Sequence, residues 1–403
     1  MLDLAAQRAR FPALRDGFAY FDNAGGSLVL DTVAQRIAEY LTTTSVQTGA
    51  SYAHSRRATE RLREARARIA LMMNARRPEE IVLGPSTTQM MRNLASAMAH
   101  RFSPGDEVIL TLFDHESNIG PWRVLAERGV IFRWWAIDPD AFEIDLDALR
   151  ALMGPRTRLV CVTHASNILG AINPIAEIAG IVHAGGAQLC VDAVAYAPHR
   201  AIDVQATQAD YCLFSFYKTY GPHLAAMYGR HELLLELDGL YHHFYGRDAV
   251  PAKLEPGNAN YELAWGCAAI VDYLDECGGG TGDRAAIERA FSAIAAHEAA
   301  LGERLLSYLR GRNDVTIIGQ RTAPPETRVP TISFTIAEHA PDAIVARIDG
   351  AGIGVRHGDF HSRRLIEHLG LAGRGGVVRV SMVHYNTLEE VDRLIVALDG
   401  ALA

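Results

Sequence analysis

The sequence predicts an α/β protein built on a mostly parallel, doubly wound sheet with a smaller α+β C-terminal domain. The middle of the chain alternates short apolar runs with helical patterns, which is the rhythm of βαβ units. A glycine run at 278–280 ends this rhythm, and a long helix, a few strands and a final helix follow. We therefore expect a large domain over residues 22–277 and a small domain formed by residues 1–21 together with residues 278–403.

Five apolar runs are the predicted strands of the large sheet. They cover residues 107–112, 131–137, 158–163, 188–191 and 211–214. Several are apolar throughout, as expected for parallel strands that are buried on both faces. Residues 173–184 have a helical pattern that begins near Pro174 and ends before Gly185. Ligands of such sheets bind at the carboxyl ends of the strands, so we expect the functional residues there.

The remaining segments are predicted to form helices and a second group of strands. An amphipathic helix is expected at 59–74 and a long alanine-rich helix at 283–310. Three further strands are expected at 315–318, 331–336 and 377–383. The last helix opens with the capping box Thr387-x-x-Glu390. Trp134 and Trp135 are adjacent in a strand, so their rings should face opposite sides of the sheet.

The composition is ordinary for a globular protein and excludes several classes of partner. The 403 residues include 39 Lys and Arg against 47 Asp and Glu, which gives a net charge of −8 and no general attraction to nucleic acid or anionic lipid. No run of eighteen apolar residues indicates a membrane span, and the first residues lack the pattern of a secretory signal. The five cysteines are scattered without a CxxC pair, so we expect reduced thiols, no metal centre and a cytoplasmic enzyme.

The first candidate site lies where a short apolar strand, residues 81–84, turns into a helix. Thr87 and Thr88 stand at the start of that helix, where free backbone N–H groups and the helix dipole attract an anion. The same stretch also fits an ordinary capping box, Ser86-x-x-Gln89. The residues alone therefore leave a phosphate site and a simple helix cap as alternatives.

Asp192 and Lys218 follow two predicted strands at the same edge of the sheet. Asp192 comes directly after the run at 188–191, and Lys218 lies among aromatic residues shortly after the run at 211–214. About one βαβ step separates them, so both can stand on neighbouring strands. Burial would lower the pKa of Lys218 and make its neutral amine available as a nucleophile or Schiff-base partner. A turn-forming Asp and a surface Lys are the ordinary alternatives.

His115 follows the first strand of the sheet, between Asp114 and Glu116. An imidazole there could act as a general base, stack on a ring, bind a metal or serve only the structure. The two acids alternate with the His, which is weak support for a metal site.

Taken together, these motifs resemble the fold-type I enzymes that depend on pyridoxal 5′-phosphate (PLP), specifically the class V aminotransferase and cysteine desulfurase group. The resemblance runs from Tyr20-Phe21-Asp22-Asn23-Ala24 to Tyr385-Asn386-Thr387 and onward, nearly the whole chain. Its most specific stretches are His115-x-x-Asn118-x-x-Pro121-Trp122, Thr163-His164-x-Ser166-Asn167-x-Leu169-Gly170, Phe214-Ser215-x-x-Lys218-x-Tyr220-Gly221-Pro222 and Arg379-x-Ser381-x-x-x-Tyr385-Asn386-Thr387. It implies the PLP-dependent transferase fold of type I, PLP as cofactor, an amino acid as substrate and a homodimer with shared active sites.

The resemblance also implies a role for each candidate residue. Lys218 would hold PLP as a Schiff base and then carry protons, while Asp192 would pair with the ring nitrogen. His115 would stack on the ring. Residues implied at the phosphate are Thr87, Thr88, Ser215, Tyr217 and, from the partner subunit, Asn258. Residues implied at the substrate carboxylate are Asn167, which would also lie near ring O3′, Arg379 and Arg356.

Three positions depart from the family pattern. Ala195 stands where the family has a glutamine beside ring O3′, so that hydrogen bond would fall to Tyr196 or a water. Tyr217 replaces a His and keeps a hydroxyl near the phosphate. His361, in the stretch Val355-Arg356-His357-Gly358-Asp359-Phe360-His361, stands where desulfurases carry the Cys that takes sulfur as a persulfide. Imidazole cannot form the same stable persulfide, and no cysteine lies nearby in sequence.

The replacement of the desulfurase Cys by His361 determines which reaction we expect. We expect β-elimination or C–S or C–Se lyase chemistry on a cysteine-like amino acid, without an enzyme persulfide. Transamination and epimerisation stay open, and His361 or His357 could supply the acid that epimerisation needs, or could be plain loop residues. A non-catalytic PLP-fold binding protein is a further alternative. The basic stretch 54–57 could meet an anionic substrate tail or only solvent, and the aromatic run 241–245 could line the substrate pocket or the dimer seam.

Overall fold

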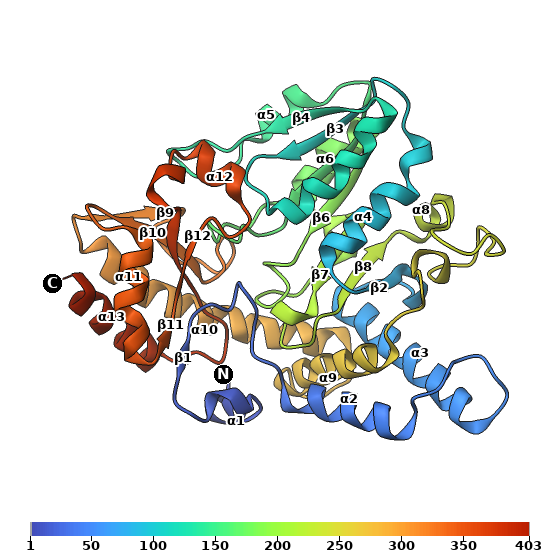
Figure 1. Cartoon of the computed structure of the whole chain (residues 1–403), viewed down its shortest axis with the longest axis horizontal. Coiled ribbons are helices and arrows are strands. Elements are labelled where there is room, and N and C mark those ends of the chain that lie inside the picture. The colour runs from blue at the N-terminus through green and yellow to red at the C-terminus, as the bar shows by residue number, and fades with distance from the viewer. Residues whose placement is uncertain (1, 403) are drawn as a thin grey trace.

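The computed structural model describes residues 2–402 and centres on a seven-stranded sheet (Figure 1). Its strands in spatial order are β2 (Ile81–Gly84), β8 (Ala225–Gly229), β7 (Tyr211–Ser215), β6 (Gln188–Asp192), β5 (Thr157–Thr163), β3 (Glu107–Thr111) and β4 (Ile131–Trp135). Strands β7, β6, β5, β3 and β4 pair in parallel, and β8 runs antiparallel to both β7 and β2. The mostly parallel α/β sheet predicted from the sequence is confirmed.

Helices cover both faces of the sheet, as its apolar strands require. On β5, Val160 and Val162 join the core under α6 (Ile175–Ala184), whereas Leu159 and Cys161 join the core under α4 (Thr87–Ala97). The first of these faces is also covered by three long helices, α3 (Ala53–Met73), α9 (Tyr261–Cys277) and α10 (Arg284–Arg310). Helices α2 (Asp31–Thr43), α3 and α9 pack together along one edge of the molecule (Figure 1).

The small domain is an antiparallel sheet with helices on it. Its strands in order are β12 (Arg356–Gly358), β13 (Val377–Ser381), β10 (Thr331–Ile336) and β9 (Val315–Ile318). Helices α11 (Pro341–Ile348) and α13 (Leu388–Leu402) pack on it with the end of α10. The N-terminal strand β1 (Ala19–Tyr20) pairs with β11 (Ile353–Gly354), so the start of the chain lies against this part. The domain boundaries themselves stay a prediction, and residues 1 and 403 lie outside the described chain.

Shorter helices complete the fold. They are α1 (Leu4–Ala9), α5 (Leu146–Leu152), α7 (Val204–Thr207), α8 (His231–Glu236) and α12 (Arg363–His368). Short 3₁₀ helices are η1 (Pro12–Leu14), η2 (Pro78–Glu80), η3 (Ala99–Arg101), η4 (Glu116–Asn118), η5 (Gly120–Arg128), η6 (Phe216–Lys218), η7 (Ala252–Leu254), η8 (Asp349–Ala351) and η9 (Ala372–Arg374). Across residues 2–402, no helix combines the length and the apolar character needed to cross a bilayer.

Most of the predicted elements match, and the differences have physical causes. Helix α3 begins at Ala53 rather than at residue 59, because its first turns bury Ser55 and Ala58 instead of large apolar residues. The stretch 54–57 therefore lies inside this helix. Strand β8 was not predicted, since its sequence is mainly alanine and glycine and has no strand alternation. The capping box Thr387-x-x-Glu390 forms as predicted, whereas at Ser86-x-x-Gln89 only the Ser86 cap forms, because the Gln89 side chain donates to Asn93 instead. Trp135 is buried while Trp134 is 38% exposed.

His384 lies in a buried hydrogen-bond chain and should make stability depend on pH. Its Nδ1 meets the hydroxyl of Tyr220 at 3.1 Å and its Nε2 that of Tyr273 at 2.6 Å. Burial lowers its pKa to about 3, whereas an unfolded His titrates near about 6.5. Its stabilising contribution is therefore complete above about pH 6.5 and is lost as the pH falls. We expect His384→Gln to remove a slope of about 1.4 kcal/mol per pH unit between about pH 6 and 4.

Denaturant unfolding of both proteins at several pH values checks this expectation. Carboxyl groups contribute to both curves alike, so the difference between the two slopes isolates His384. Equal slopes would mean that His384 takes up its proton in the folded state.

Candidate active site

Asp192 and Lys218 meet at the carboxyl edge of the sheet. Asp192 is the last residue of β6, which pairs in parallel with β7, and Lys218 ends η6 directly after β7. Both side chains are buried, Lys218 to 7% exposure, and both line one cavity, called here the inner cavity. Other predicted residues on its wall are Thr87, Thr88, His115, Asn167, Ser215 and Tyr217. Sequence reasoning therefore brought eight residues to one site.

Burial shifts the proton affinities of Asp192 and Lys218 toward neutrality. Removal from water and the positive charge of Arg379 together lower the pKa of Lys218 to about 8, against the opposing charges of Asp192 and Asp22. Removal from water also raises the pKa of Asp192 to about 6, which a backbone N–H bond from Val194 and the charge of Lys218 oppose. Near neutral pH a carboxylate and a readily deprotonated amine thus face the same cavity.

His115 lines the same cavity as a neutral ring. Burial lowers its pKa to about 3, with Lys218, His361 and Arg379 acting in the same direction. Its Nδ1 accepts a hydrogen bond from the backbone N–H of Ser117 at 3.1 Å, which places the ring proton on Nε2. A neutral, fixed imidazole suits stacking on a flat ligand ring.

Hydroxyl groups flank the N-terminus of α4 where an anion would bind. Ser86 caps the helix by accepting the N–H of Gln89 at 3.2 Å, so the helix-cap interpretation is confirmed. Thr87 Oγ1 pairs with Ser215 Oγ at 2.5 Å, and Thr88 Oγ1 pairs with Ser117 Oγ at 2.6 Å. The cap and an anion cradle are compatible, because the two threonine hydroxyls line the inner cavity. Ser117 was not predicted from the sequence. Its position two residues after His115 is the feature that could have indicated it.

Arg379 is a buried cation whose guanidinium is held in place by neighbouring residues. Its Nη2 donates to Asp22 Oδ1 at 3.0 Å and its Nη1 donates to the carbonyl of Asn167 at 3.2 Å, while its Nε is buried without a hydrogen-bond partner. The ring of Phe360 covers the guanidinium at 3.7 Å. Burial lowers the pKa of Arg379 to about 10, so it stays charged at neutral pH. Asp22 also pairs with Arg356 at 3.3 Å.

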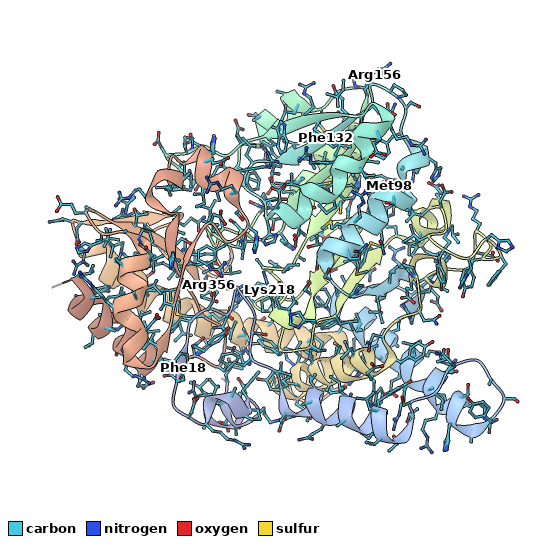
Figure 2. All side chains as sticks on the ribbon, viewed as in Figure 1. Phe18, Met98, Phe132, Arg156, Lys218 and Arg356 are labelled. Atoms are coloured by element: carbon cyan, nitrogen blue, oxygen red, sulfur yellow. The ribbon has the colours of Figure 1, made fainter. Side chains whose placement is uncertain are left out.

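An outer cavity adjoins the inner one across Lys218. Lys218, Tyr217, His115 and Asn167 line both, and the outer wall adds Arg356, His357, His361 and Arg379. Lys218 and Arg356 lie beside each other where the small domain meets the large sheet (Figure 2). The rings of His361 and His115 are 5.3 Å apart. The small domain thus supplies one wall of the site.

A family model described as aminotransferase class V matches residues 19–394. The chain belongs to this family. An aminotransferase-like protein of Gibberella zeae is 44% identical over 98% of this chain and 97% of its own length. A cysteine desulfurase-like protein of Aspergillus flavus is 31% identical over 99% of this chain and 90% of its own. The cysteine desulfurase structure from Thermococcus onnurineus matches with a TM-score of 0.89 and 27% identity, covering 99% of this chain and 98% of that one.

These matches confirm the class V resemblance and the PLP fold of type I. Enzymes of this family depend on PLP, are usually dimeric and act on amino acids. The inner cavity fits such a cofactor by its donor set. It offers a buried amine at Lys218, a carboxylate at Asp192, a neutral ring at His115 and a hydroxyl-rich helix N-terminus. The unpartnered Nε of Arg379 adds a cation for a carboxylate beside it.

Some predicted residues lie elsewhere or are already engaged. Asn258 lines a separate groove beside Pro85 and His223, so within one chain it does not reach the inner cavity, and its predicted phosphate contact would need a second subunit. The ring of Tyr196 stacks on His164 with 3.5 Å between ring centres, and the wall of the inner cavity includes Ala195 but not Tyr196. The contact of Tyr196 with ring O3′ stays a prediction. The run 241–245 lies on an exposed loop, with Tyr245 on a groove away from Lys218.

The side-chain amide of Asn167 contacts the protein itself. Its Nδ2 donates to the carbonyl of Phe360 at 3.1 Å, and its Oδ1 accepts from Ser362 Oγ at 2.9 Å. Asn167 lines both cavities, and its contact with a substrate carboxylate stays a prediction.

Proposed function

We propose that this chain is a PLP-dependent enzyme that breaks the bond between Cβ and sulfur or selenium in a cysteine-like amino acid, without an enzyme persulfide. The observation that carries the proposal is that His361, which the family resemblance aligns with the sulfur-accepting Cys of desulfurases, lines the outer cavity with Lys218. The chain would act as a homodimer in which Asn258 of one subunit reaches the phosphate in the other.

The position of every cysteine supports a reaction without a persulfide. Cys161, Cys190, Cys212 and Cys267 are buried in the core, and burial raises the pKa of Cys161, Cys212 and Cys267. Cys277 is partly buried at the end of α9, and burial raises its pKa to about 11. The thiolate is the reactive form of cysteine, so these residues are poor sulfur acceptors.

Residues of the inner cavity would hold the cofactor. Lys218 would bind its aldehyde carbon, Asp192 would pair with its ring nitrogen and His115 would lie on its face. Thr87, Thr88 and Ser215 would bind its phosphate with the N-terminus of α4. Bound PLP supplies an electron sink for the charge left at the substrate Cα.

The chain's own residues then handle the substrate and its protons. Arg379 binds the substrate carboxylate and thereby fixes which bond at Cα faces Lys218. Lys218, as a neutral amine, takes the proton from Cα. Asp192 stays ionised and keeps the ring nitrogen protonated. His361, on the wall of the outer cavity, gives a proton to the leaving sulfur or to the product carbon.

Product analysis tests the proposal. With cysteine as substrate, Cα–H and Cβ–S cleavage followed by addition of one water gives pyruvate, ammonia and hydrogen sulfide in equal amounts. Purified holoenzyme should release all three, and trapping with an alkylating agent should find no persulfide on any cysteine. A stoichiometric persulfide, with alanine as the product, would instead indicate ordinary desulfuration and refute the role given to His361.

Transamination is a second candidate, favoured by the 44% identity to a protein named aminotransferase-like. It differs in where the amino group goes. A transaminase passes the amino group to a keto acid, so turnover would need an added keto acid and would release no sulfide. Epimerisation would return the proton to the opposite face of Cα and change only the optical rotation.

Arg379→Lys should weaken binding of the substrate carboxylate more than it slows the chemistry. A lysine lacks the planar fork and cannot serve Asp22, Asn167 and a carboxylate together. We expect KM for cysteine to rise roughly 10–100-fold with a smaller change in kcat. Cysteamine, which lacks the carboxylate, is the control substrate. If the variant loses as much on cysteamine as on cysteine, Arg379 does not bind the carboxylate.

A further inference from the structure

Hydrogen bonds hold the turn that carries His361, residues 359–362, against the large domain. The N–H of Glu116 donates to the carbonyl of His361 at 2.7 Å. The Asn167 amide accepts from Ser362 and donates to the carbonyl of Phe360. Phe360 and His361 have φ angles of 52° and 59°, a conformation that non-glycine residues adopt rarely and that the surroundings must hold in place. The turn therefore depends on contacts from outside its own segment.

An ion pair between Arg364 and Glu116 adds a second link beside the turn. Arg364, on the first turn of α12, donates to Glu116 Oε2 at 3.2 Å, and its guanidinium lies 4.7 Å from the ring of Trp134 at the sheet edge. Glu116 thus binds the small domain twice, through its backbone N–H to His361 and through its carboxylate to Arg364. Both contacts link η4, directly after His115, to the segment that faces Lys218.

We propose that Glu116 and Arg364 are positioning residues that hold His361 as a fixed wall of the active site rather than as part of a mobile arm. The proposal rests on the function proposed above, in which His361 handles a proton. A proton donor must stay within hydrogen-bond reach of the reacting atoms. The contacts that hold the turn meet this requirement for His361.

The chain offers a matched control in the neighbouring arginine. Arg363 is also on the first turn of α12, but it pairs with Glu367 at 2.8 Å and Asp359 at 3.8 Å, both in its own segment. Arg363→Met removes the same charge without touching the large domain. Arg364→Lys keeps a charge that can reach Glu116 and is the conservative variant.

Hydrogen exchange and kinetics on the holoenzyme test the proposal together. In Arg364→Met we expect peptides with residues 116–119 and 359–362 to exchange about two- to fivefold faster, the range for a partly exposed ion pair. We expect kcat to fall about tenfold with a smaller change in KM, because a displaced proton donor slows the chemical step. Arg364→Lys should restore part of each effect, and Arg363→Met, which loses only a 3.8 Å pair with Asp359 in the turn, should leave kcat and the exchange of residues 116–119 unchanged.

Each contrary outcome has a separate meaning. Unchanged exchange in Arg364→Met would show that the pair does not hold the turn. Faster exchange with unchanged kcat would show that the turn is held for structural reasons only. Equal effects in Arg363→Met would assign them to lost charge. If the wild type turns over no amino acid, the proposed function fails and no positioning role remains, while the exchange data still decide whether the pair fastens the turn.

Discussion

Replacing Lys218 by alanine is expected to abolish turnover and to remove the visible absorption band of the cofactor-loaded protein. The side chain is buried at the boundary of the two cavities, and its amine has a pKa of about 8 because burial disfavours its charge. No other amine lines the inner cavity, which belongs wholly to the described part of the chain. One general acid–base group usually contributes roughly 10²–10⁴-fold to the rate, so we expect kcat to fall by at least this factor. Loss of the covalent link to the cofactor should lower kcat further.

A second buried lysine makes the comparison specific. The Nζ of Lys253 donates to the carbonyls of Leu235, Leu237 and Arg247, which satisfy its three protons. Lys253→Met should therefore cost stability but keep the absorption band and the activity per folded protein. Borohydride reduction followed by mass spectrometry should place a covalent cofactor on the peptide with Lys218. A label on any other lysine would refute the assignment.

The sequence was informative where one residue breaks a local pattern. Asp192 and Lys218 are charged residues at the end of a buried strand or just after one. Parallel strands bring such positions to the same edge of the sheet. The hydroxyls at the start of α4 were visible for the same reason, because a helix start has its own local signature. These signals are short-range, and they located the inner cavity without any knowledge of the small domain.

The outer cavity could not be predicted in this way, because distant parts of the chain form it. Asp22 and Arg379 are far apart in sequence but form an ion pair at 3.0 Å. Phe360 covers Arg379 from another segment of the small domain, and Glu116 of the large domain binds Arg364 of the small one. No local periodicity encodes such pairs. The family resemblance identified Arg379 and His361 as site residues. It did not identify the residues that contact them and hold them in place.

Replacing Asp192 by asparagine is expected to have the second largest effect. Asparagine is nearly isosteric, and its Oδ1 can still accept the N–H of Val194, which the carboxylate binds at 2.9 Å. The fold should therefore persist while the negative charge is lost. Without that charge the cofactor's ring nitrogen loses the anion that keeps it protonated, so we expect kcat to fall roughly 10²–10⁴-fold. Asp192→Glu keeps the charge and should recover part of the rate.

The pH dependence separates this charge effect from a packing defect. In the wild type the carboxyl of Asp192 has a pKa of about 6, so activity should decline as the pH falls through 6 and Asp192 takes up a proton. That decline should be absent from Asp192→Asn. The asparagine should also lower the pKa of Lys218, because Asp192 stabilises its charged form. Asp210, a buried carboxylate at the opposite end of β6 that accepts the N–H of Leu189 at 2.8 Å, is the matched control. Asp210→Asn should lower the melting temperature and leave the pH profile unchanged, and a profile altered alike in both variants would mean that the sheet, not the charge at Asp192, sets the rate.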